Sequence, residues 1–206
     1  LEALATAAAA GDGVIRRPSD NQPVKSVVFV QCAGQRDPSG THLAYCSGYC
    51  CNTSIKQAMY FKDANPSVDT TIIYTDLRTP GNGEDFYRSA QEKGVIFTKG
   101  KVAEVVPNGA TSTVKFHDLI LDDKDAAMLD VDLVVLATGQ VPNSGINIDA
   151  PAVAAEEGVV EVKPISILNL TYRQGKDVPQ LKQGFTASHF ICFPYETRRT
   201  GIYTAG

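Results

Sequence analysis

The sequence has no long hydrophobic run and no extended cluster of basic residues. A helix that crosses a bilayer needs about 20 consecutive apolar residues, and no stretch of these 206 residues approaches that length. Lys and Arg number 19 against 23 Asp and Glu, and no basic run is longer than the pair Arg198 and Arg199. Such a pattern gives no electrostatic footprint for a phosphate backbone. We therefore exclude nucleic acid as the main partner and expect no direct insertion into a membrane.

The N-terminal residues lack the features of a secretory signal. Residues 1–10 are rich in alanine, but they include Glu2 and no basic segment precedes them. The five cysteines are odd in number, and a chain with 43% hydrophobic residues can bury a core without disulfide bonds. We expect a soluble, globular, cytoplasmic chain whose thiols are reduced and have a chemical role.

Short hydrophobic segments alternate with helical patterns in the first half of the chain. Residues 25–31 (KSVVFVQ) form a β-branched, continuously apolar run that is typical of a strand covered on both faces. Apolar residues recur at helical spacing over 52–64, and the pattern stops at Asn65-Pro66. A second strand (70–75), a helix (84–93) and a third strand (95–98) follow. This order predicts a βαβαβ unit with a parallel sheet.

The patterns change after the third predicted strand. Residues 101–106 and 113–116 alternate apolar and polar residues around a Pro-Asn-Gly turn, which predicts an antiparallel hairpin. Residues 131–137 (VDLVVLA) form another buried strand. Beyond Gly139, scattered Pro and Gly predict an irregular connection with short strands near 158–162 and 166–170.

The turn after the first strand carries cysteine where a nucleotide-binding unit would carry a Gly-x-Gly-x-x-Gly cradle. Such a cradle lets bare backbone reach a pyrophosphate at a helix N-terminus, but residues 31–37 are QCAGQRD. Cys32 is followed by Cys46, Cys50 and Cys51 within nineteen positions. The four thiols should meet at the end of one strand and the start of one helix, as a site for soft metals.

The spacing favours an iron–sulfur cluster among the metals that four thiolates bind. Structural zinc sites usually close on Cys-x-x-Cys pairs, which this sequence lacks, whereas two of its cysteines are consecutive. Adjacent cysteines on a helix diverge by about 100° and reach separate irons of a cubane more easily than one ion. The helix N-terminus also favours thiolates and a negative cluster. Zinc, and free or redox-active thiols, are the alternatives.

Small residues end two apolar strands and form a second candidate site. Ala137, Thr138 and Gly139 end the strand over 131–137, where small residues let another backbone or a flat cofactor approach closely. The tail 201–206 (GIYTAG) is a similar apolar run and ends in Thr204, Ala205 and Gly206.

The remaining reactive side chains have no motif partners. Cys192 stands between apolar residues, so we expect it to pack in the core. His42, His117 and His189 belong to no recognisable triad. We therefore assign no catalytic residue.

The cysteine pattern and its surroundings resemble the A subunit of heterodisulfide reductase. They resemble still more closely the related flavin subunits, A or B, of the quinone-interacting membrane-bound oxidoreductase of sulfur metabolism. The four-cysteine pattern is the specific part of this likeness, because Ala-Thr-Gly is shared by many flavoproteins. The matching segments are 29–37, 45–51, 55–58, 76–80, 84–87, 137–139 and 193–203.

The resemblance implies a fold like that of thioredoxin reductase, in which an FAD domain is interrupted by a second nucleotide-binding-like domain. It makes 1–23 a linker and 24–140 a three-layer α/β domain with a parallel sheet and a β-hairpin. Residues 141–206 would be an irregular connection and a truncated return into the FAD domain. Because an N-terminal Gly-x-Gly-x-x-Gly strand is lacking, we expect stable FAD binding to need further chain.

The resemblance also implies the cofactor contacts. Cys32, Cys46, Cys50 and Cys51 would bind a [4Fe-4S] cluster close to the flavin. Two groups of small residues would approach FAD: Ala137, Thr138 and Gly139, and Thr204, Ala205 and Gly206.

With the four-thiol pattern, the resemblance implies the electron-transfer part of an iron–sulfur flavoprotein oxidoreductase, in which a cluster and FAD exchange electrons within a sulfur-metabolism complex. Its partners would be other subunits of a redox complex, which could itself associate with a membrane. The alternative is a non-catalytic assembly module that binds zinc or no metal and docks through residues 140–190. A dithiol oxidoreductase using Cys50 and Cys51 ranks last, because adjacent cysteines form strained disulfides.

Overall fold

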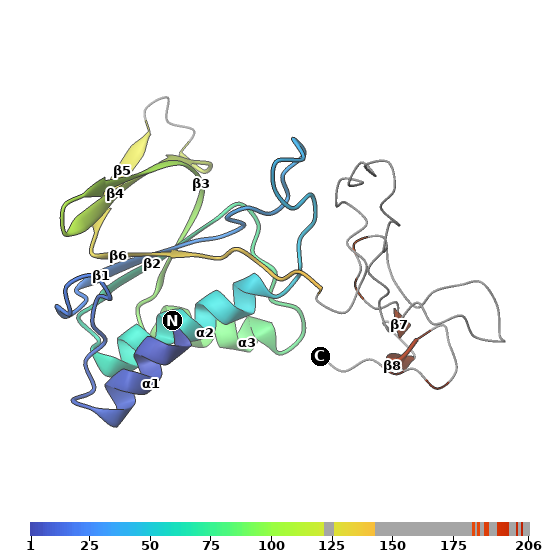
Figure 1. Cartoon of the computed structure of the whole chain (residues 1–206), viewed down its shortest axis with the longest axis horizontal. Helices are drawn as coiled ribbons and strands as arrows, with labels where there is room; N and C mark the ends of the chain where they lie inside the picture. Colours follow the sequence, from blue (N-terminus) through green and yellow to red (C-terminus); the bar gives the residue numbers. More distant parts are fainter. Residues whose placement is uncertain are drawn as a thin grey trace, which may run out of the picture. The chain divides into compact units, whose positions relative to one another are not determined.

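The computed structural model describes residues 1–121, 126–142, 183, 185, 188–189, 193–197, 201 and 203. They belong to two compact units, Leu1–Gln140 and Val141–Gly206. The first unit contains the helices and the main sheet, whose elements Figure 1 shows in sequence colours. All four predicted metal ligands lie in this unit.

Four parallel strands form the centre of the first unit. β1 (Ser26–Val30) pairs with β2 (Asp69–Tyr74) on one side and with β6 (Leu133–Leu136) on the other, and β2 pairs with β3 (Ile96–Asn108). The order β3-β2-β1-β6 places the first strand inside the sheet. Its continuous run of apolar residues is buried there, as a strand covered on both faces requires. The predicted parallel βαβαβ unit is confirmed.

Two crossover helices cover one face of this sheet. α2 (Cys50–Ala64) connects β1 to β2, and α3 (Gly83–Glu92) connects β2 to β3. Figure 1 shows both helices on the same side of the strands. Phe61 of α2 stands edge-on to Phe29 of β1, with ring centroids 6.3 Å apart. The buried face of α2 recurs at helical spacing and consists of Cys51, Ser54, Ile55, Ala58 and Phe61.

A third helix, rich in alanine, packs on the same face. Alanine has the highest helix propensity, and α1 (Glu2–Ala10) buries Ala8 in the core between the helices and the sheet. Glu2 accepts a 2.9 Å hydrogen bond from the Tyr60 hydroxyl of α2. Residues 1–23, assigned to a linker by resemblance, therefore contain a packed helix as well as connecting chain.

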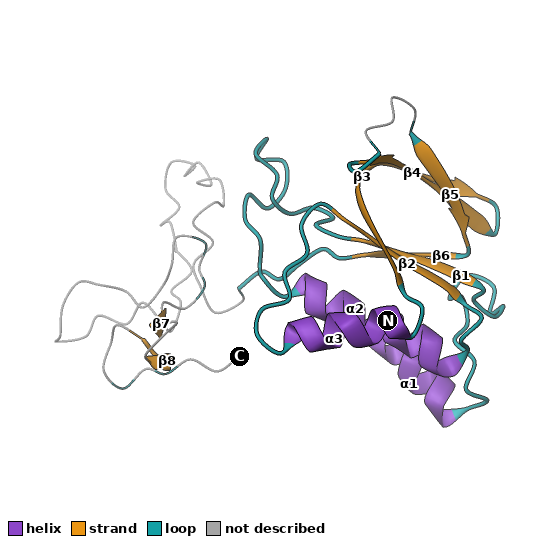
Figure 2. Cartoon of the chain, turned by 180° about the vertical axis from the view of Figure 1, so that it is seen from behind, coloured by secondary structure: helices purple, strands orange, loops and turns teal. Residues whose placement is uncertain are grey.

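An antiparallel meander covers the opposite face and makes the unit three-layered. The second half of β3 pairs with β4 (Thr111–Asp118), which pairs in turn with β5 (Ala127–Val131). Side chains of β4 and β5 form a second core cluster with Val28 of β1 and Ile73 of β2. Figure 2 shows the meander across the sheet from the helices. The predicted three-layer α/β class with a parallel sheet and β-hairpin is confirmed.

Gly100 lies where β3 passes from the parallel sheet into the meander. A Cβ at this position would come within 2.9 Å of the Phe116 ring and 3.0 Å of the His117 carbonyl oxygen. A residue without a side chain therefore lets β3 and β4 approach closely at this point.

The strand predicted over 131–137 corresponds to β6, which lies at the edge of the sheet and is half-buried rather than buried, and Val131 ends β5, a strand that the sequence did not predict. Asp132 separates the two strands. Its carboxylate accepts hydrogen bonds from the backbone N–H groups of Lys25 and Ser26, at 2.8 and 3.1 Å, and from Arg17 at 3.0 Å. The side chains of Arg17 and Asp132 are only 11% and 16% exposed. This ion pair fixes the start of β1 beside the start of β6.

The second unit contains a described hairpin. β7 (Ser188–His189) pairs antiparallel with β8 (Phe193–Thr197), and Glu196 forms a bridge with Tyr203. The strands predicted near 158–162 and 166–170 lie outside the described residues. Within the part of the chain that the structure describes, no helix is both long enough and apolar enough to cross a membrane.

Replacing Asp132 with Ala should lower the free energy of unfolding by about 2–3 kcal/mol, because two backbone N–H groups and a guanidinium lose a charged acceptor. Asp63→Ala, which removes an exposed ion pair with Lys93, is the control and should have a far smaller effect. Urea unfolding measures both values. Equal losses in the free energy of unfolding in the two variants would show that Asp132 does not hold β1 beside β6.

Candidate metal centre

The four predicted ligands lie at the carboxyl end of the parallel strands. Cys32 follows β1, Cys50 and Cys51 begin α2, and Cys46 lies in the loop between them. All four are free thiols. The structure brings them to the edge at which open α/β sheets bind their ligands.

The loop that carries Cys46 is folded back on itself by backbone hydrogen bonds. The Arg36 N–H donates to the Tyr45 carbonyl at 3.1 Å, and the Asp37 N–H donates to the Leu43 carbonyl at 3.0 Å. These bonds pair the two halves of the loop and return Cys46 toward the end of β1.

The backbone alternates in handedness directly after β1. Cys32, Gly34 and Arg36 have φ values of +56°, +80° and +56°, and the residues between them, Ala33 and Gln35, have negative φ. Within this segment the N–H groups of Gln35 and Arg36 donate to the backbone carbonyls of Cys32 and Tyr45, at 3.2 and 3.1 Å. Cys32 carries backbone strain because it is not glycine, and such strain concentrates at functional sites.

The thiols are spread over the ends of three neighbouring strands. Cys32 ends β1, and the buried Cys51 Sγ lies 4.0 Å from the carbonyl oxygen of Asp76, which follows β2. Cys50 lies toward β6, because the Gln35 side chain contacts both its sulfur and the Ala137 carbonyl. The two consecutive cysteines therefore face different strand ends.

The thiols influence one another electrostatically. Burial raises the pKa of Cys32, the Arg36 guanidinium opposes this rise, and the charges of Cys46 and Cys50 add to it. Burial likewise raises the pKa of Cys51, and the other three cysteines raise it further. Four ionised thiols are thus unfavourable here without a cation among them, whereas a bound metal deprotonates its thiol ligands.

Several donors around the thiols favour negative charge. Arg36 pairs with Asp76 at 2.7 Å and lies close enough to Cys32 to lower its pKa. The Gly48 N–H donates to Cys46 Sγ at 3.4 Å. The N-terminus of α2, whose cap residue makes no side-chain hydrogen bond to the helix, adds the positive end of the helix dipole.

The donor set suits a metal bound by sulfur in its chemistry, because four free thiols lie at this edge of the sheet together with one guanidinium. Within residues 1–121 and 126–142 and the short described stretches beyond them, no group of three or more His, Cys, Asp or Glu is arranged to hold a metal ion. The assignment of Cys32, Cys46, Cys50 and Cys51 as ligands therefore stays a prediction.

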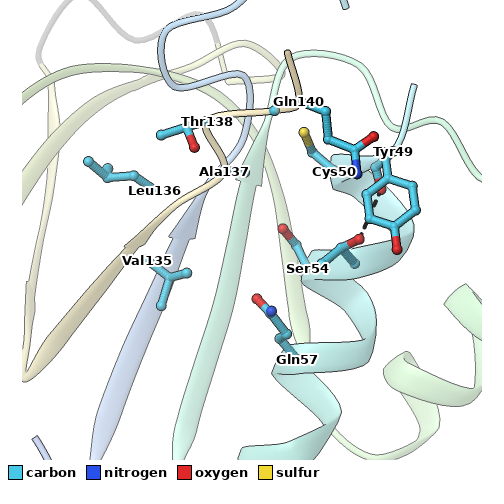
Figure 3. A pocket seen from close by; sticks show the side chains of 11 residues that line it. Tyr49, Cys50, Ser54, Gln57, Val135, Leu136, Ala137, Thr138 and Gln140 are labelled. Carbon is cyan, nitrogen blue, oxygen red and sulfur yellow. Dashed lines mark hydrogen bonds between the residues drawn. The ribbon is translucent and has the colours of Figure 1, made fainter. Parts of the chain in front are cut away.

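A cavity of about 220 Å³ opens beside Cys50, between the start of α2 and the end of β6. Figure 3 shows Ser54 and Gln57 projecting from α2 toward the β6 side of this cavity. The predicted cofactor residues Ala137, Thr138 and Gly139 line it, and its described lining is uncharged. The other predicted cofactor residues, Thr204, Ala205 and Gly206, lie outside the described residues.

Sequence reasoning gave no role to Gln35, which is central to this site. Its side chain is 6% exposed and contacts Cys50 and Ala137, the latter 102 positions away. No local pattern reveals a contact over such a separation. The one available signal was Gly139, which we expected to admit a close approach: a Cβ there would lie 2.1 Å from the Gln35 amide carbon.

The other reactive residues are exposed or lie outside the described part of the chain. His42 and His117 are exposed. The side chain of His189 and the whole of Cys192 lie outside the described residues.

The chain is similar in sequence to the A subunits of three heterodisulfide reductases. It is 33% identical over 210 residues to that of the H(2):CoB-CoM heterodisulfide,ferredoxin reductase of Methanothermobacter marburgensis, covering 100% of this chain and 28% of that protein. It is 40% identical over 183 residues to that of the ferredoxin:CoB-CoM heterodisulfide reductase of Methanosarcina acetivorans (88% and 20%). It is 38% identical over 147 residues to the iron-sulfur A subunit of the CoB--CoM heterodisulfide reductase of Methanocaldococcus jannaschii (69% and 22%). No protein-family model matches the chain.

The chain thus spans only 20–28% of the length of these relatives. Two solved structures resemble it in part. The match to the thioredoxin reductase of T. acidophilum covers 88% of this chain and 43% of the reductase chain, with a TM-score of 0.42 and 14% identity. The match to LpdA from Mycobacterium tuberculosis covers 60% of this chain and 22% of the LpdA chain, with a TM-score of 0.40 and 16% identity.

The left-handed backbone at Cys32 makes a prediction for the metal-free chain. Cys32→Gly should be more stable than Cys32→Ala by about 1 kcal/mol, because both lose the thiol but only glycine adopts positive φ without strain. Cys46 has negative φ, so at this control position the glycine variant should instead be less stable than the alanine variant. Denaturant unfolding of the four variants measures both differences. The same order of stability at both positions would contradict the backbone described after β1.

Proposed function

Because the chain is homologous to a segment of the A subunits of heterodisulfide reductases, we propose that it is part of an iron–sulfur flavoprotein oxidoreductase. In this proposal Cys32, Cys46, Cys50 and Cys51 hold a [4Fe-4S] cluster, which when bound supplies one-electron exchange with FAD. The observation that carries the proposal is that four free thiols lie at the carboxyl edge of the parallel sheet, close enough for the neighbouring thiols to raise the pKa of Cys32 and of Cys51.

The local geometry supports iron over zinc. Cys50 faces the end of β6 and Cys51 the end of β2, so consecutive residues can reach separate metal atoms. A structural zinc site needs all four thiols around one ion. The start of α2 offers N–H groups and the positive end of its dipole to a negative cluster. The relative from Methanocaldococcus jannaschii is itself named an iron-sulfur subunit.

The residues around the thiols offset the charge of the thiolates and orient them. Electron exchange at the cluster requires no proton transfer by these residues. Arg36 offsets the thiolate charge at Cys32 and is held by Asp76. The Gly48 N–H donates to Cys46. Burial of Cys51 keeps water from that side of the site, and burial together with hydrogen bonds to sulfur sets the reduction potential of such centres.

In this proposal, residues 137–139 contact the flavin. The uncharged cavity beside Cys50 is lined by these residues, so the edge of a flat neutral ring bound there would lie next to a cluster ligand. At about 220 Å³ the cavity is smaller than typical sites for whole ligands, which measure roughly 300–1,000 Å³. The rest of FAD would bind elsewhere, with Thr204, Ala205 and Gly206 among its expected contacts and with further chain.

The proposed partners are other subunits of a redox complex. The relatives are named as subunits of enzymes whose names join a heterodisulfide with ferredoxin. The closer likeness to the flavin subunits of the quinone-interacting complex, a role in sulfur metabolism and a cytoplasmic location are predictions from residue patterns alone.

Anaerobic purification followed by metal analysis tests the cluster. The chain should be brown and contain about four iron and four sulfide per polypeptide. Cys50→Ala should lose the cluster, because it removes a proposed ligand, whereas the control Cys192→Ala should keep it. Equal iron loss in both variants would contradict the ligand assignment. A colourless chain with one zinc would favour the assembly module instead.

Neither NADH nor NADPH should reduce the cluster-loaded chain. The turn that would cradle their pyrophosphate is replaced by Cys32, the buried Gln35 and Arg36. Anaerobic spectral titration with each nucleotide measures this, with dithionite reduction as the positive control. Tight binding of either nucleotide, or bleaching by it alone, would contradict the prediction.

A further inference from the structure

We propose that Gln35 is a positioning residue whose side-chain amide raises the reduction potential of the cluster through Cys50 and ties the cysteine site to the end of β6. This inference rests on the proposed function, because it needs a cluster bound to Cys50. It assigns a role to a residue between the first and second cysteines that no cysteine pattern predicts.

The amide of Gln35 bonds to three separate segments of the chain. Its Nε2 donates to Cys50 Sγ at 3.1 Å and to the Ala137 carbonyl at 3.4 Å. Its Oε1 accepts from the Ser47 backbone N–H at 3.0 Å. The side chain is almost fully buried, so water competes little for these bonds and each is stronger than it would be on the surface.

The two backbone partners determine which end of the amide faces the sulfur. A carbonyl oxygen only accepts a hydrogen bond and a backbone N–H only donates one. Rotating the amide by 180° would therefore break the contacts with both Ala137 and Ser47. Nε2 must face Cys50, and the sulfur must accept.

Gly139 is the reason that Gln35 fits. A Cβ at position 139 would lie 2.1 to 2.4 Å from the three terminal heavy atoms of the Gln35 side chain. The glycine also has a φ of +86°, which other residues rarely adopt. The small residue expected to admit a cofactor therefore admits a side chain of the same polypeptide, directly beside the cavity at Cys50.

These contacts have a direct effect on electron transfer. An N–H···S bond stabilises the more negative, reduced cluster more than the oxidised one, and so raises its reduction potential. The same amide holds Cys50 at a fixed position relative to Ala137, the strand end that we propose lies beside the flavin. Gln35 thus connects the two proposed redox sites by hydrogen bonds.

Anaerobic redox titration of the cluster-loaded chain, monitored by electron paramagnetic resonance, tests this role. Gln35→Leu should lower the midpoint potential, because the donor is lost. Gln35→Glu should lower it further, because a carboxylate places negative charge beside Cys50. Gln91→Leu makes the same change on α3, where the amide donates to the Tyr87 hydroxyl instead of a thiol, and should keep the wild-type potential. Iron content should be equal in all four proteins.

A second variant tests the packing argument without altering the amide. Gly139→Ala should displace Gln35 and lower the potential of the wild-type chain, yet have little further effect when Gln35 is already Leu. Such non-additivity indicates that the two positions act through one interaction. If Gln35→Leu does not retain its cluster, the midpoint potential of Gly139→Ala alone tests the role of Gln35.

The outcomes separate this inference from the proposed function. Unchanged potentials in cluster-loaded Gln35→Leu and Gly139→Ala would overturn the role of Gln35 and leave the cluster assignment intact. A wild-type chain that binds no cluster under anaerobic reconstitution would overturn the proposed function, and the role of Gln35 with it.

Discussion

Four thiols gathered at one edge of a parallel sheet repel one another once they ionise, and the rest of the site depends on how that repulsion is relieved. The raised pKa of Cys32 and of Cys51 expresses the problem, since burial and the neighbouring thiols both disfavour the charged forms. Arg36 and the start of α2 supply positive charge and N–H groups on the same side. These groups offset the repulsion only in part, because the pKa of Cys32 and of Cys51 stays raised. A cation bound by the thiolates would neutralise the remaining negative charge.

Open α/β sheets bind ligands such as nucleotides at the carboxyl ends of their strands, and the four thiols lie at this same edge. β1 lies between β2 and β6, and the crevice at its carboxyl end is where strand order changes direction. In place of a glycine-rich turn for phosphate, the chain there has Cys32 and a loop that returns Cys46 to the same place. Asp132 fixes β1 beside β6 at the far end of both strands.

Much of this could be predicted from the sequence, because the relevant signals are local. The apolar run of β1, the helical spacing of α2 and the Pro-Asn-Gly hairpin each depend on a few consecutive residues, and the four cysteines lie within nineteen positions. The role of Asp132 could not be predicted, since its carboxylate accepts from Arg17 and Lys25, which lie more than 100 positions away. Gln35 was missed for the same reason, because its contact with Ala137 joins residues 102 positions apart.

The central claim is that iron and sulfide occupy the space among these four thiols. Mössbauer spectroscopy of the chain reconstituted anaerobically with ⁵⁷Fe measures this directly, because it reports the oxidation state, spin coupling and ligand type of every iron. Our account predicts the signature of a spin-coupled cubane in which all irons have sulfur ligands. Iron in oxygen or nitrogen coordination, or an isolated ferric or ferrous ion among the cysteines, would contradict it.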